Sequence, residues 1–279
     1  MEKIQSAIAK ARAARTDQDV AGPPSQAQAT TAPVAPAAAA AAAVTEAWKK
    51  LATFAPPAKL LKRHRIVTAA ETAEGMAQFD KLRTRVMQEM RANGWRRLAI
   101  TSPTSACGKS TVVLNLAFSL ARQTDLRFVV NEIDMRRPSL ARTLGLSGSR
   151  SFASVLQGDA DFADQAIRPR PNVALGLNQT PIRNSAELLQ RPSVGIALAE
   201  IEAKFDPTLT LFDLPPMLTN DDAMAFIGQV DCALLVVAAG SCTLREIDTC
   251  ERELATQTNV LGIVLNKCRY MDRDAGHDY

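Results

Sequence analysis

The residues from Pro103 to Ser110 have the types and spacing of a phosphate-binding loop. They end in Gly108, Lys109 and Ser110. In such a loop, backbone N–H groups surround phosphate oxygens, the lysine reaches the terminal phosphates and the hydroxyl binds Mg²⁺. Pro103 replaces the usual leading glycine, so the motif is incomplete, and phosphate binding is a hypothesis that the flanking elements must support.

The elements on either side of this loop occur in the order that phosphate binding needs. Residues 98–102 form a short apolar run typical of a buried strand, and residues 111–121 place apolar side chains at helical spacing. A helix that begins directly after the loop adds roughly half a positive charge at its N-terminus. The order of strand, loop and helix therefore favours a phosphate site.

A pair of acids lies at the end of the apolar run at residues 126–133. Glu132 and Asp134 are two positions apart, so on a strand their side chains point the same way. The C-terminal end of the strands is where open α/β sheets bind ligands. We expect both carboxylates to converge there. A surface salt bridge between Asp134 and Arg136 is the alternative.

Another acid, Asp213, lies near the end of the apolar run at residues 209–214, just before Pro215 and Pro216. This arrangement is typical of a Walker B motif, whose carboxylate holds Mg²⁺ directly or through water. A helix cap is the alternative role for a single acid at a strand end. Acids at these strand ends in a chain with a phosphate loop make nucleotide binding the leading interpretation.

Length and composition narrow the class of protein. The 279 residues are 47% hydrophobic, enough for a sizeable core, and the five cysteines form no CxxC pair. A net charge of +4 does not by itself indicate nucleic acid, so we expect no nucleic-acid partner. No stretch approaches the roughly 20 apolar residues that span a bilayer, and no secretion signal is evident. We therefore expect a cytoplasmic location.

Four regions are expected along the chain. Residues 1–16 read as a short basic amphipathic helix, with a docking or membrane-surface role and a solvated terminus as alternatives. Residues 17–58, rich in Ala, Pro, Gln and Thr, read as a disordered linker. Residues 59–269 alternate strand-like and helical patterns, which predicts an α/β P-loop domain with a mostly parallel sheet and helices on both faces. Residues 270–279 form a polar tail.

Five segments occur in the same order in bacterial tyrosine kinases. They are residues 101–111, 132–138, 184–189, 212–216 and 264–267. The most specific is Asp134 followed by Arg136, Arg137 and Pro138. From about Phe79 to Arg269 the chain resembles these autokinases of capsule and exopolysaccharide synthesis, which belong to the wider MinD/ParA-like P-loop group.

The resemblance implies ATP and Mg²⁺ as cofactors. Lys109 would contact the β and γ phosphates, and the phosphate-binding residues would be Ser105, Ala106, Cys107, Gly108, Lys109, Ser110 and Thr111. Mg²⁺ would be organised by Ser110, Asp134 and Asp213. Glu132 stands where the family has an aspartate that helps to deprotonate the incoming tyrosine, and Asn266 stands where the family contacts adenine. Cys107 is either an oxidation-sensitive thiol or a plain small loop residue.

Tyr270 and Tyr279 are the only tyrosines, and both lie in the last ten residues. This placement favours a phosphate-accepting tail over structural roles for the two rings. The resemblance further implies a homo-oligomer and a separate membrane-embedded polysaccharide chain-length regulator, which would hold the protein at the inner face of the membrane. The family's Glu-x-x-Arg-x-x-Arg ring helix aligns with Ala77, Asp80 and Arg83, so only its last arginine is kept.

Three functions remain in competition at the level of sequence. The first is an ATP- and Mg²⁺-dependent tyrosine autokinase that regulates polysaccharide polymerisation and export. The second is a MinD/ParA-like ATPase switch, which the absence of a second loop lysine at residues 103–107 disfavours. The third is a non-catalytic, ATP-dependent scaffold, which Glu132 and the small number of tyrosines leave open.

Overall fold

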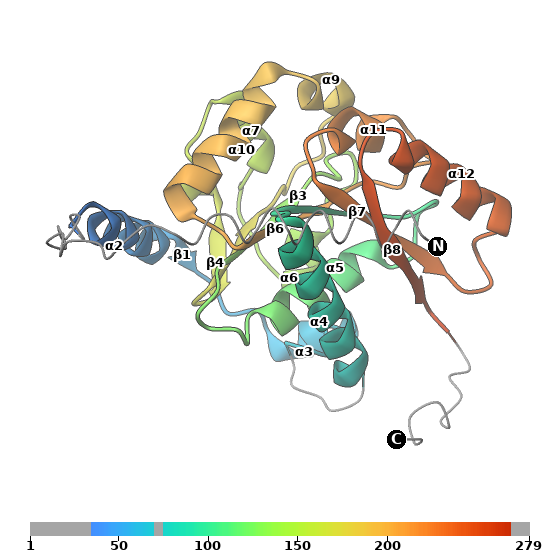
Figure 1. Ribbon diagram of the computed structural model, residues 1–279, viewed down its shortest axis with the longest axis horizontal. Coiled ribbons are helices and arrows are strands. Elements are labelled where there is room, and N and C mark those ends of the chain that lie inside the picture. Colours follow the sequence, from blue (N-terminus) through green and yellow to red (C-terminus); the bar gives the residue numbers. More distant parts are fainter. Residues whose placement is uncertain (1–34, 70–74, 269–279) are drawn as a thin grey trace, which may run out of the picture. The chain divides into compact units, whose positions relative to one another are not determined.

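The computed structural model describes residues 35–69 and 75–268 (Figure 1). Residues Ala41–Tyr279 form one compact unit and Met1–Ala40 another. The predicted basic helix at residues 1–16 and the tyrosine tail at residues 270–279 lie outside the described residues. The fold that follows is that of the larger unit.

Within the described residues, eight strands form one sheet in the order β1-β4-β5-β3-β6-β2-β7-β8. Neighbouring strands are parallel, except that β4 and β5 are antiparallel. This confirms the expected α/β class. The strands are β1 (Ala52–Thr53), β2 (Arg97–Thr101), β3 (Phe128–Glu132), β4 (Ile167–Arg170), β5 (Val173–Gly176), β6 (Leu209–Asp213), β7 (Cys232–Ala238) and β8 (Asn259–Asn266).

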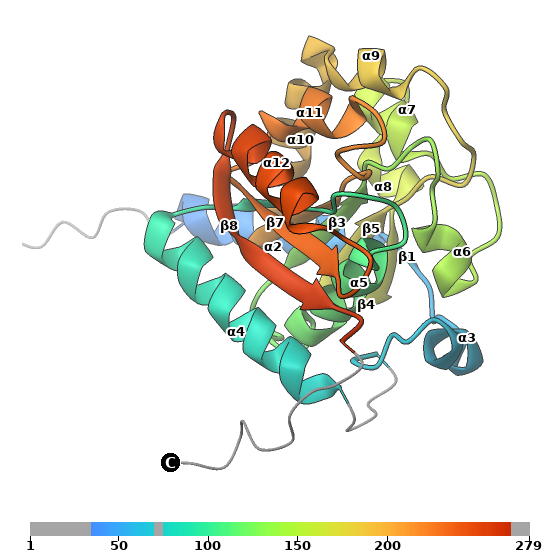
Figure 2. The same cartoon turned by 90° about the vertical axis from the view of Figure 1, so that its right-hand side faces the viewer.

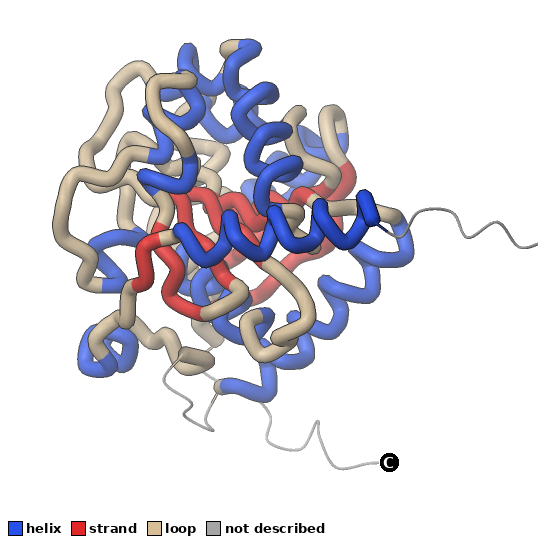
Figure 3. Tube along the Cα trace, turned by 90° about the vertical axis from the view of Figure 1, so that its left-hand side faces the viewer, coloured by secondary structure: helices blue, strands red, loops and turns tan. Residues whose placement is uncertain are grey.

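Helices cover both faces of the sheet, which Figures 2 and 3 show from opposite sides with the strands between two helical layers. The helices of one layer are α3 (Ala58–Arg63), α4 (Met76–Asn93), α5 (Lys109–Leu120) and α6 (Leu140–Leu144). Those of the other are α7 (Phe152–Gln157), α8 (Phe162–Gln165), α9 (Ser185–Leu189), α10 (Pro192–Phe205), α11 (Asp222–Ile227) and α12 (Leu244–Ala255).

The central strands build a separate core on each face because successive side chains point to opposite sides of a sheet. In β2, Leu98 and Ile100 join the core under α4 and α5, while Ala99 joins the core under α10 and α11. In β6, Leu211 joins the core under α4 and α5, and Phe212 joins the core under α10 and α11. Strands buried on both faces are continuous apolar runs, and for this reason the sequence pattern predicts them well.

The structure differs from the predicted linker over residues 35–58. Helix α2 (Ala35–Lys50) occupies most of this segment, and β1 then pairs in parallel with β4. Trp48 is 3% exposed. Its indole Nε1 donates a hydrogen bond of 2.7 Å to the Phe205 carbonyl oxygen. Alanine has the highest helix propensity, and one buried indole gives this helix an apolar anchor that the average composition of the segment conceals.

Candidate functional site: a phosphate loop beside buried Lys109, Asp134 and Asp213

The loop between β2 and α5 has the backbone shape that a phosphate cradle needs. Ala106 and Gly108 both have positive φ, 62° and 92°. A Cβ atom on Gly108 would lie 2.3 Å from Asn266 Nδ2, so a side chain there would displace the Asn266 amide, and the positive φ by itself favours glycine. The Pro103 carbonyl accepts a 3.0 Å hydrogen bond from the Leu218 N–H. The loop is thus formed without the usual leading glycine.

Lys109, Asp134 and Asp213 meet at the start of α5. Lys109 Nζ lies 2.9 Å from Asp134 Oδ2 and 3.2 Å from Asp213 Oδ1, and all three side chains are buried. Burial by itself lowers the pKa of Lys109, but the two carboxylates outweigh this effect and raise it. The lysine is therefore protonated and charged.

Burial raises the pKa of Asp213 as well, although the charge of Lys109 opposes the rise. The second carboxylate oxygen of Asp213, Oδ2, is buried and accepts no hydrogen bond from the described residues. A buried, unpaired carboxylate oxygen fits a cation ligand or a water bound to a cation.

A cavity of about 380 Å³ opens beside these groups. Its wall contains the phosphate loop and Asp134, together with three arginines from the segment after β3 and from α6. The arginines are Arg136, Arg137 and Arg142. Arginine side chains with loop N–H groups are the usual partners of phosphate oxygens. The predicted loop residues that line the cavity are Ser105, Ala106, Gly108, Lys109, Ser110 and Thr111.

These residues fit a nucleotide with a bound Mg²⁺. Ser110 Oγ lies 3.4 Å from Lys109 Nζ and 3.3 Å from Ser139 Oγ, at the mouth of the same cavity. Among the described residues, no group of three or more His, Cys, Asp or Glu side chains forms a metal site by itself. Mg²⁺ keeps several waters and binds through one or two carboxylates plus substrate phosphates, so the available donors suit that ion.

Glu132 has a different environment from the one that the sequence predicts. It does not line the cavity beside Asp134. Its Oε1 accepts hydrogen bonds from the backbone N–H groups of Ser139 (2.6 Å) and Leu140 (2.8 Å), and its Oε2 accepts one from Asn178 (3.0 Å). Burial raises its pKa to about 7, although these three bonds oppose the rise. Glu132 therefore holds the segment that carries Arg136 and Arg137.

Arg136 pairs with Asp222 of α11, so the predicted alternative, a bridge from Arg136 to Asp134, is wrong. The contact is bidentate, with Nε to Oδ2 at 2.8 Å and Nη2 to Oδ1 at 2.9 Å. The Ser185 hydroxyl donates to the same carboxylate at 2.7 Å. Sequence reasoning missed Asp222. The nearest signal in the sequence is the similarity of residues 184–189 to the kinase family, because Ser185 of that segment donates to Asp222.

Asn266 and Cys107 make contacts that support the phosphate loop outside the cavity. Asn266 Nδ2 donates a 2.9 Å hydrogen bond to the Cys107 carbonyl, and neither residue lines the cavity. Cys107 Sγ lies 3.3 Å from Cys242 Sγ. A contact of Asn266 with adenine stays a prediction. Cys242 had no signal in the sequence, because 135 positions separate it from Cys107.

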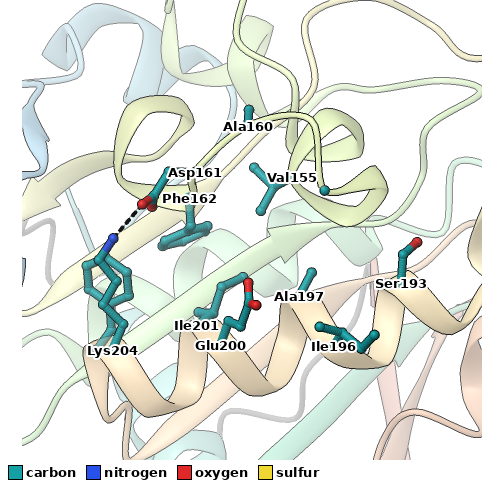
Figure 4. A pocket seen from close by; sticks show the side chains of 12 residues that line it. Val155, Ala160, Asp161, Phe162, Ser193, Ile196, Ala197, Glu200, Ile201 and Lys204 are labelled. Atoms are coloured by element: carbon teal, nitrogen blue, oxygen red, sulfur yellow. Dashed lines mark hydrogen bonds and ion pairs between the residues drawn. The ribbon is translucent and has the colours of Figure 1, made fainter.

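A larger cavity, of about 540 Å³, lies between α10 and the segment from α7 to α8 (Figure 4). Its wall is mostly apolar, with Phe162, Ile196 and Ile201 among its residues. The ion pair between Lys204 and Asp161 closes one end at 2.5 Å. The charged side chains in its described lining are Asp161, Glu200 and Lys204, and all three are exposed, unlike the buried ion pairs at the phosphate loop. The chemistry therefore points to the smaller cavity.

No helix of the described residues has the length and apolar character needed to cross a membrane.

Comparison with known proteins agrees with this geometry. The chain is 26% identical over 209 residues to the tyrosine-protein kinase YwqD of Bacillus subtilis, covering 74% of this chain and 86% of that one. It is 28% identical to the tyrosine-protein kinase CpsD of Streptococcus agalactiae, covering 68% of this chain and 81% of that one. Against the longer tyrosine-protein kinase wzc of Salmonella typhi the identity is 26%, covering 78% of this chain and 31% of that one.

Solved structures give the same relationship. The kinase domain of the Escherichia coli tyrosine kinase ETK superposes with a TM-score of 0.63 at 26% identity, covering 71% of this chain and 78% of that one. The model of the CobQ/CobB/MinD/ParA nucleotide-binding domain matches residues 98–278. The similarity to bacterial tyrosine kinases expected from the sequence is confirmed, and the chain belongs to the CobQ/CobB/MinD/ParA nucleotide-binding family.

Proposed function

We propose that the protein is an ATP- and Mg²⁺-dependent protein-tyrosine kinase that phosphorylates Tyr270 and Tyr279 of its own tail. The observation that carries this proposal is Lys109 held between Asp134 and Asp213 at a phosphate loop. The ammonium group of Lys109 is buried, and both of its partners are carboxylates, which are common ligands of Mg²⁺. The named activity of the relatives supports tyrosine as the acceptor.

In this proposal the loop from Ser105 to Thr111 and Lys109 hold the ATP phosphates. Ser110, Asp134 and Asp213 hold Mg²⁺. The bound ion would neutralise charge on the phosphoryl group during transfer. The arginines at the cavity wall would add to that neutralisation, because phosphoryl transfer depends on positioning and charge more than on covalent help from the protein.

The proton of the accepting tyrosine needs a carboxylate within reach, because an ordinary phenol has a pKa near 10. Glu132 is the candidate by resemblance. Asp134 is the carboxylate at the cavity wall, whereas three backbone N–H groups occupy Glu132. We assign Glu132 to positioning the arginine segment, and Asp134 to contact with the reacting groups.

The proposed setting is a homo-oligomer at the inner face of the membrane, in complex with a membrane-embedded polysaccharide chain-length regulator. The family resemblance supports this setting, with regulation of capsular or exopolysaccharide polymerisation and export as the outcome. Asp80 and Arg83 of α4, at positions of the family's ring helix, bond within the chain: Ser119 Oγ donates to Asp80 at 2.8 Å and Arg83 donates to the Ser119 carbonyl at 3.2 Å. The oligomer would therefore use other contacts.

A single labelling experiment tests the proposal. The full chain is incubated with γ-labelled ATP and Mg²⁺, with and without the cytoplasmic tail of a candidate regulator, and the label is mapped. We expect label on Tyr270 or Tyr279 that is lost in Lys109→Ala and in the double variant Tyr270→Phe/Tyr279→Phe. Release of free phosphate without protein label would instead support an ATPase switch. ATP binding without either reaction would support a scaffold, and failure to bind ATP would reject nucleotide-dependent function altogether.

A further inference from the structure

Two cysteine thiols from distant parts of the chain are in contact at the phosphate loop. Cys107 comes from the loop between β2 and α5, and Cys242 comes from the turn between β7 and α12. Their Sγ atoms are 3.3 Å apart. Thr104 Oγ1 lies 3.6 Å from the first sulfur and 4.0 Å from the second. A disulfide requires an S–S distance of about 2.05 Å, so a small approach of the two loops would join them.

Both backbones are held where they face each other. The Cys107 carbonyl accepts a 2.9 Å bond from Asn266, and its neighbours Ala106 and Gly108 fix the turn. The Cys242 N–H donates to the Ala238 carbonyl at 3.2 Å. The next residue, Thr243, caps α12. The thiol contact is therefore a product of two anchored turns.

The environment of the Cys107 thiol differs from that of the other buried cysteines. Burial raises the pKa of the Cys107 thiol, but hydrogen bonding with Thr104 and Cys242 outweighs this effect and lowers it. In contrast, burial raises the pKa of Cys232 and of Cys250 to about 12. The thiolate is the reactive form of cysteine. Cys242 is partly exposed, which gives an oxidant a route to the pair.

We propose that Cys107 and Cys242 are an oxidisable dithiol whose disulfide blocks nucleotide binding at the phosphate loop. Hydrogen peroxide is the oxidant. One thiol and one peroxide molecule give a sulfenic acid and water, and the second thiol then displaces the hydroxyl group to give the disulfide and a second water. Two thiol hydrogens and one peroxide are consumed for each disulfide. Thiol–disulfide exchange with a small dithiol reverses the reaction.

The disulfide would act on ATP binding because Cys107 is two residues before Lys109. The loop N–H groups must adjust to the phosphate oxygens, and a covalent tether to the turn after β7 restrains that adjustment. This consequence rests on the proposed ATP site, whereas disulfide formation does not. Linkage is reciprocal. A disulfide that weakens ATP binding ten-fold implies that saturating ATP raises the reduction potential of the pair by about 30 mV.

The test treats the full chain with hydrogen peroxide and maps disulfides by mass spectrometry of unreduced peptides. We expect a Cys107–Cys242 peptide, at least a ten-fold weaker affinity for a fluorescent ATP analogue, and recovery of both states with dithiothreitol. Cys242→Ser should bind the analogue as the reduced chain does and should lose the response to peroxide. Cys268→Ser, which removes a partly exposed thiol outside the pair, is the matched control and should respond as the unmodified sequence does.

Two results would overturn the inference. One is the absence of a Cys107–Cys242 peptide at peroxide levels that oxidise Cys268. The other is a disulfide that leaves analogue affinity unchanged. If the reduced chain fails to bind the analogue, the proposed function fails, and backbone hydrogen exchange at residues 104–110 then decides the remaining point. Oxidation should slow exchange in this loop, and unchanged exchange would contradict the tether.

Discussion

Lys109 supplies the positive charge that pairs with both carboxylates of the site. It stands between two buried carboxylates, of which Asp213 is fully buried and Asp134 nearly so. A buried ion pair is weak as a source of stability but costly to break, because the remaining charge loses its partner. This asymmetry makes Lys109 important for folding, and experiment can separate this effect from its proposed role in phosphate binding.

Replacement of Lys109 by methionine should reduce both properties. We expect the unfolding free energy to fall by about 3 kcal/mol, because two carboxylates stay buried without the ammonium group. Kinase activity should fall at least about a hundred-fold, as for removal of one charge-stabilising group. Denaturant unfolding and labelling assays measure the two effects. The control is Lys204→Met, whose half-exposed pair with Asp161 should be worth less than about 1 kcal/mol. Equal losses in the two variants would contradict the argument.

Glu132 connects the stability of the fold to pH. Burial raises its pKa to about 7 in the folded chain, from an ordinary value of 4.5. The folded state therefore binds more protons than the unfolded state between these values, so stability falls as the pH rises from about 4.5 to about 7. The expected contribution is on the order of 3 kcal/mol.

The variant Glu132→Gln tests this linkage. The difference in unfolding free energy between the unmodified chain and the variant should decrease as the pH rises through this window, because glutamine does not ionise. Urea unfolding at pH 5, 6 and 7 measures the difference, with Glu200→Gln, an exposed carboxylate, as the control for loss of one acid. A difference that is independent of pH would show that Glu132 does not titrate in this range.

At the scale of the elements, the segment after β3 and helix α11 are joined through Arg136 and Asp222. The carboxylate of Asp222 accepts two bonds from the guanidinium group and one from Ser185 at the start of α9. Asp221, the preceding residue, is 75% exposed and lies 3.9 Å from the same guanidinium group. The adjacent acids therefore form a matched pair for mutagenesis.

Asp222→Asn should weaken ATP binding, while Asp221→Asn should leave it nearly unchanged. Loss of a charged, buried partner of Arg136 removes hydrogen bonds worth about 1.5–3 kcal/mol. If half of that free energy acts on the arginine at the cavity wall, ATP affinity falls roughly four- to twelve-fold. Isothermal titration with a non-hydrolysable ATP analogue measures the change. Equal affinities of the two variants would show that this ion pair does not shape the site.

Helix α2 is attached to the C-terminal end of α10 through Trp48. The indole meets the Phe205 ring edge-on, with ring centroids 6.2 Å apart, and donates to the Phe205 carbonyl. Trp48→Ala should lower the unfolding free energy by about 3–5 kcal/mol, since a buried aromatic side chain leaves a cavity. Trp95→Ala, at a partly buried position, should cost clearly less. Similar losses would mean that α2 contributes little to the fold.

At the scale of the whole molecule, the last described strand ends beside the phosphate loop. Strand β8 ends at Asn266, whose side chain donates to the Cys107 carbonyl, and neither residue lines the cavity. Tyr270 and Tyr279 follow this strand in the sequence. In the proposed homo-oligomer, one chain can offer the acceptor tyrosine and another the ATP site, so we expect transfer between molecules.

Mixing variants tests transfer between molecules. A chain carrying Lys109→Met offers intact tyrosines but no activity, and Tyr270→Phe/Tyr279→Phe offers activity without acceptors. After mixing with γ-labelled ATP, we expect label on the Lys109→Met chain, identified by mass, at a rate that rises with the concentration of the other variant. The same inactive chain incubated alone is the control. Label that appears only on unmodified chains, never on the inactive one, would favour transfer within a molecule.

The sequence by itself predicted the interior strands β2, β3, β5, β6 and β7, because strands buried on both faces are apolar runs. It also predicted β8, an edge strand that keeps an apolar pattern although it is partly exposed. It did not predict β1 or β4 at the opposite end of the sheet. In β4, arginines alternate with Ile167 and Pro169, and β1 is two residues long. Short edge strands carry little apolar pattern, so tertiary pairing alone reveals them.

For the site, the sequence determined the phosphate loop, Asp134 and Asp213, since their local order along the chain encodes the strand ends that bring them together. Only the tertiary structure decided the partners of Glu132 and Arg136 and the contact of Cys107 with Cys242. Apart from the backbone contacts of Glu132 with Ser139 and Leu140, those partners are 46 to 135 positions apart in sequence. Their proximity follows from the order of strands in the sheet and the packing of α11 and α12 above it, which no local pattern of residues records.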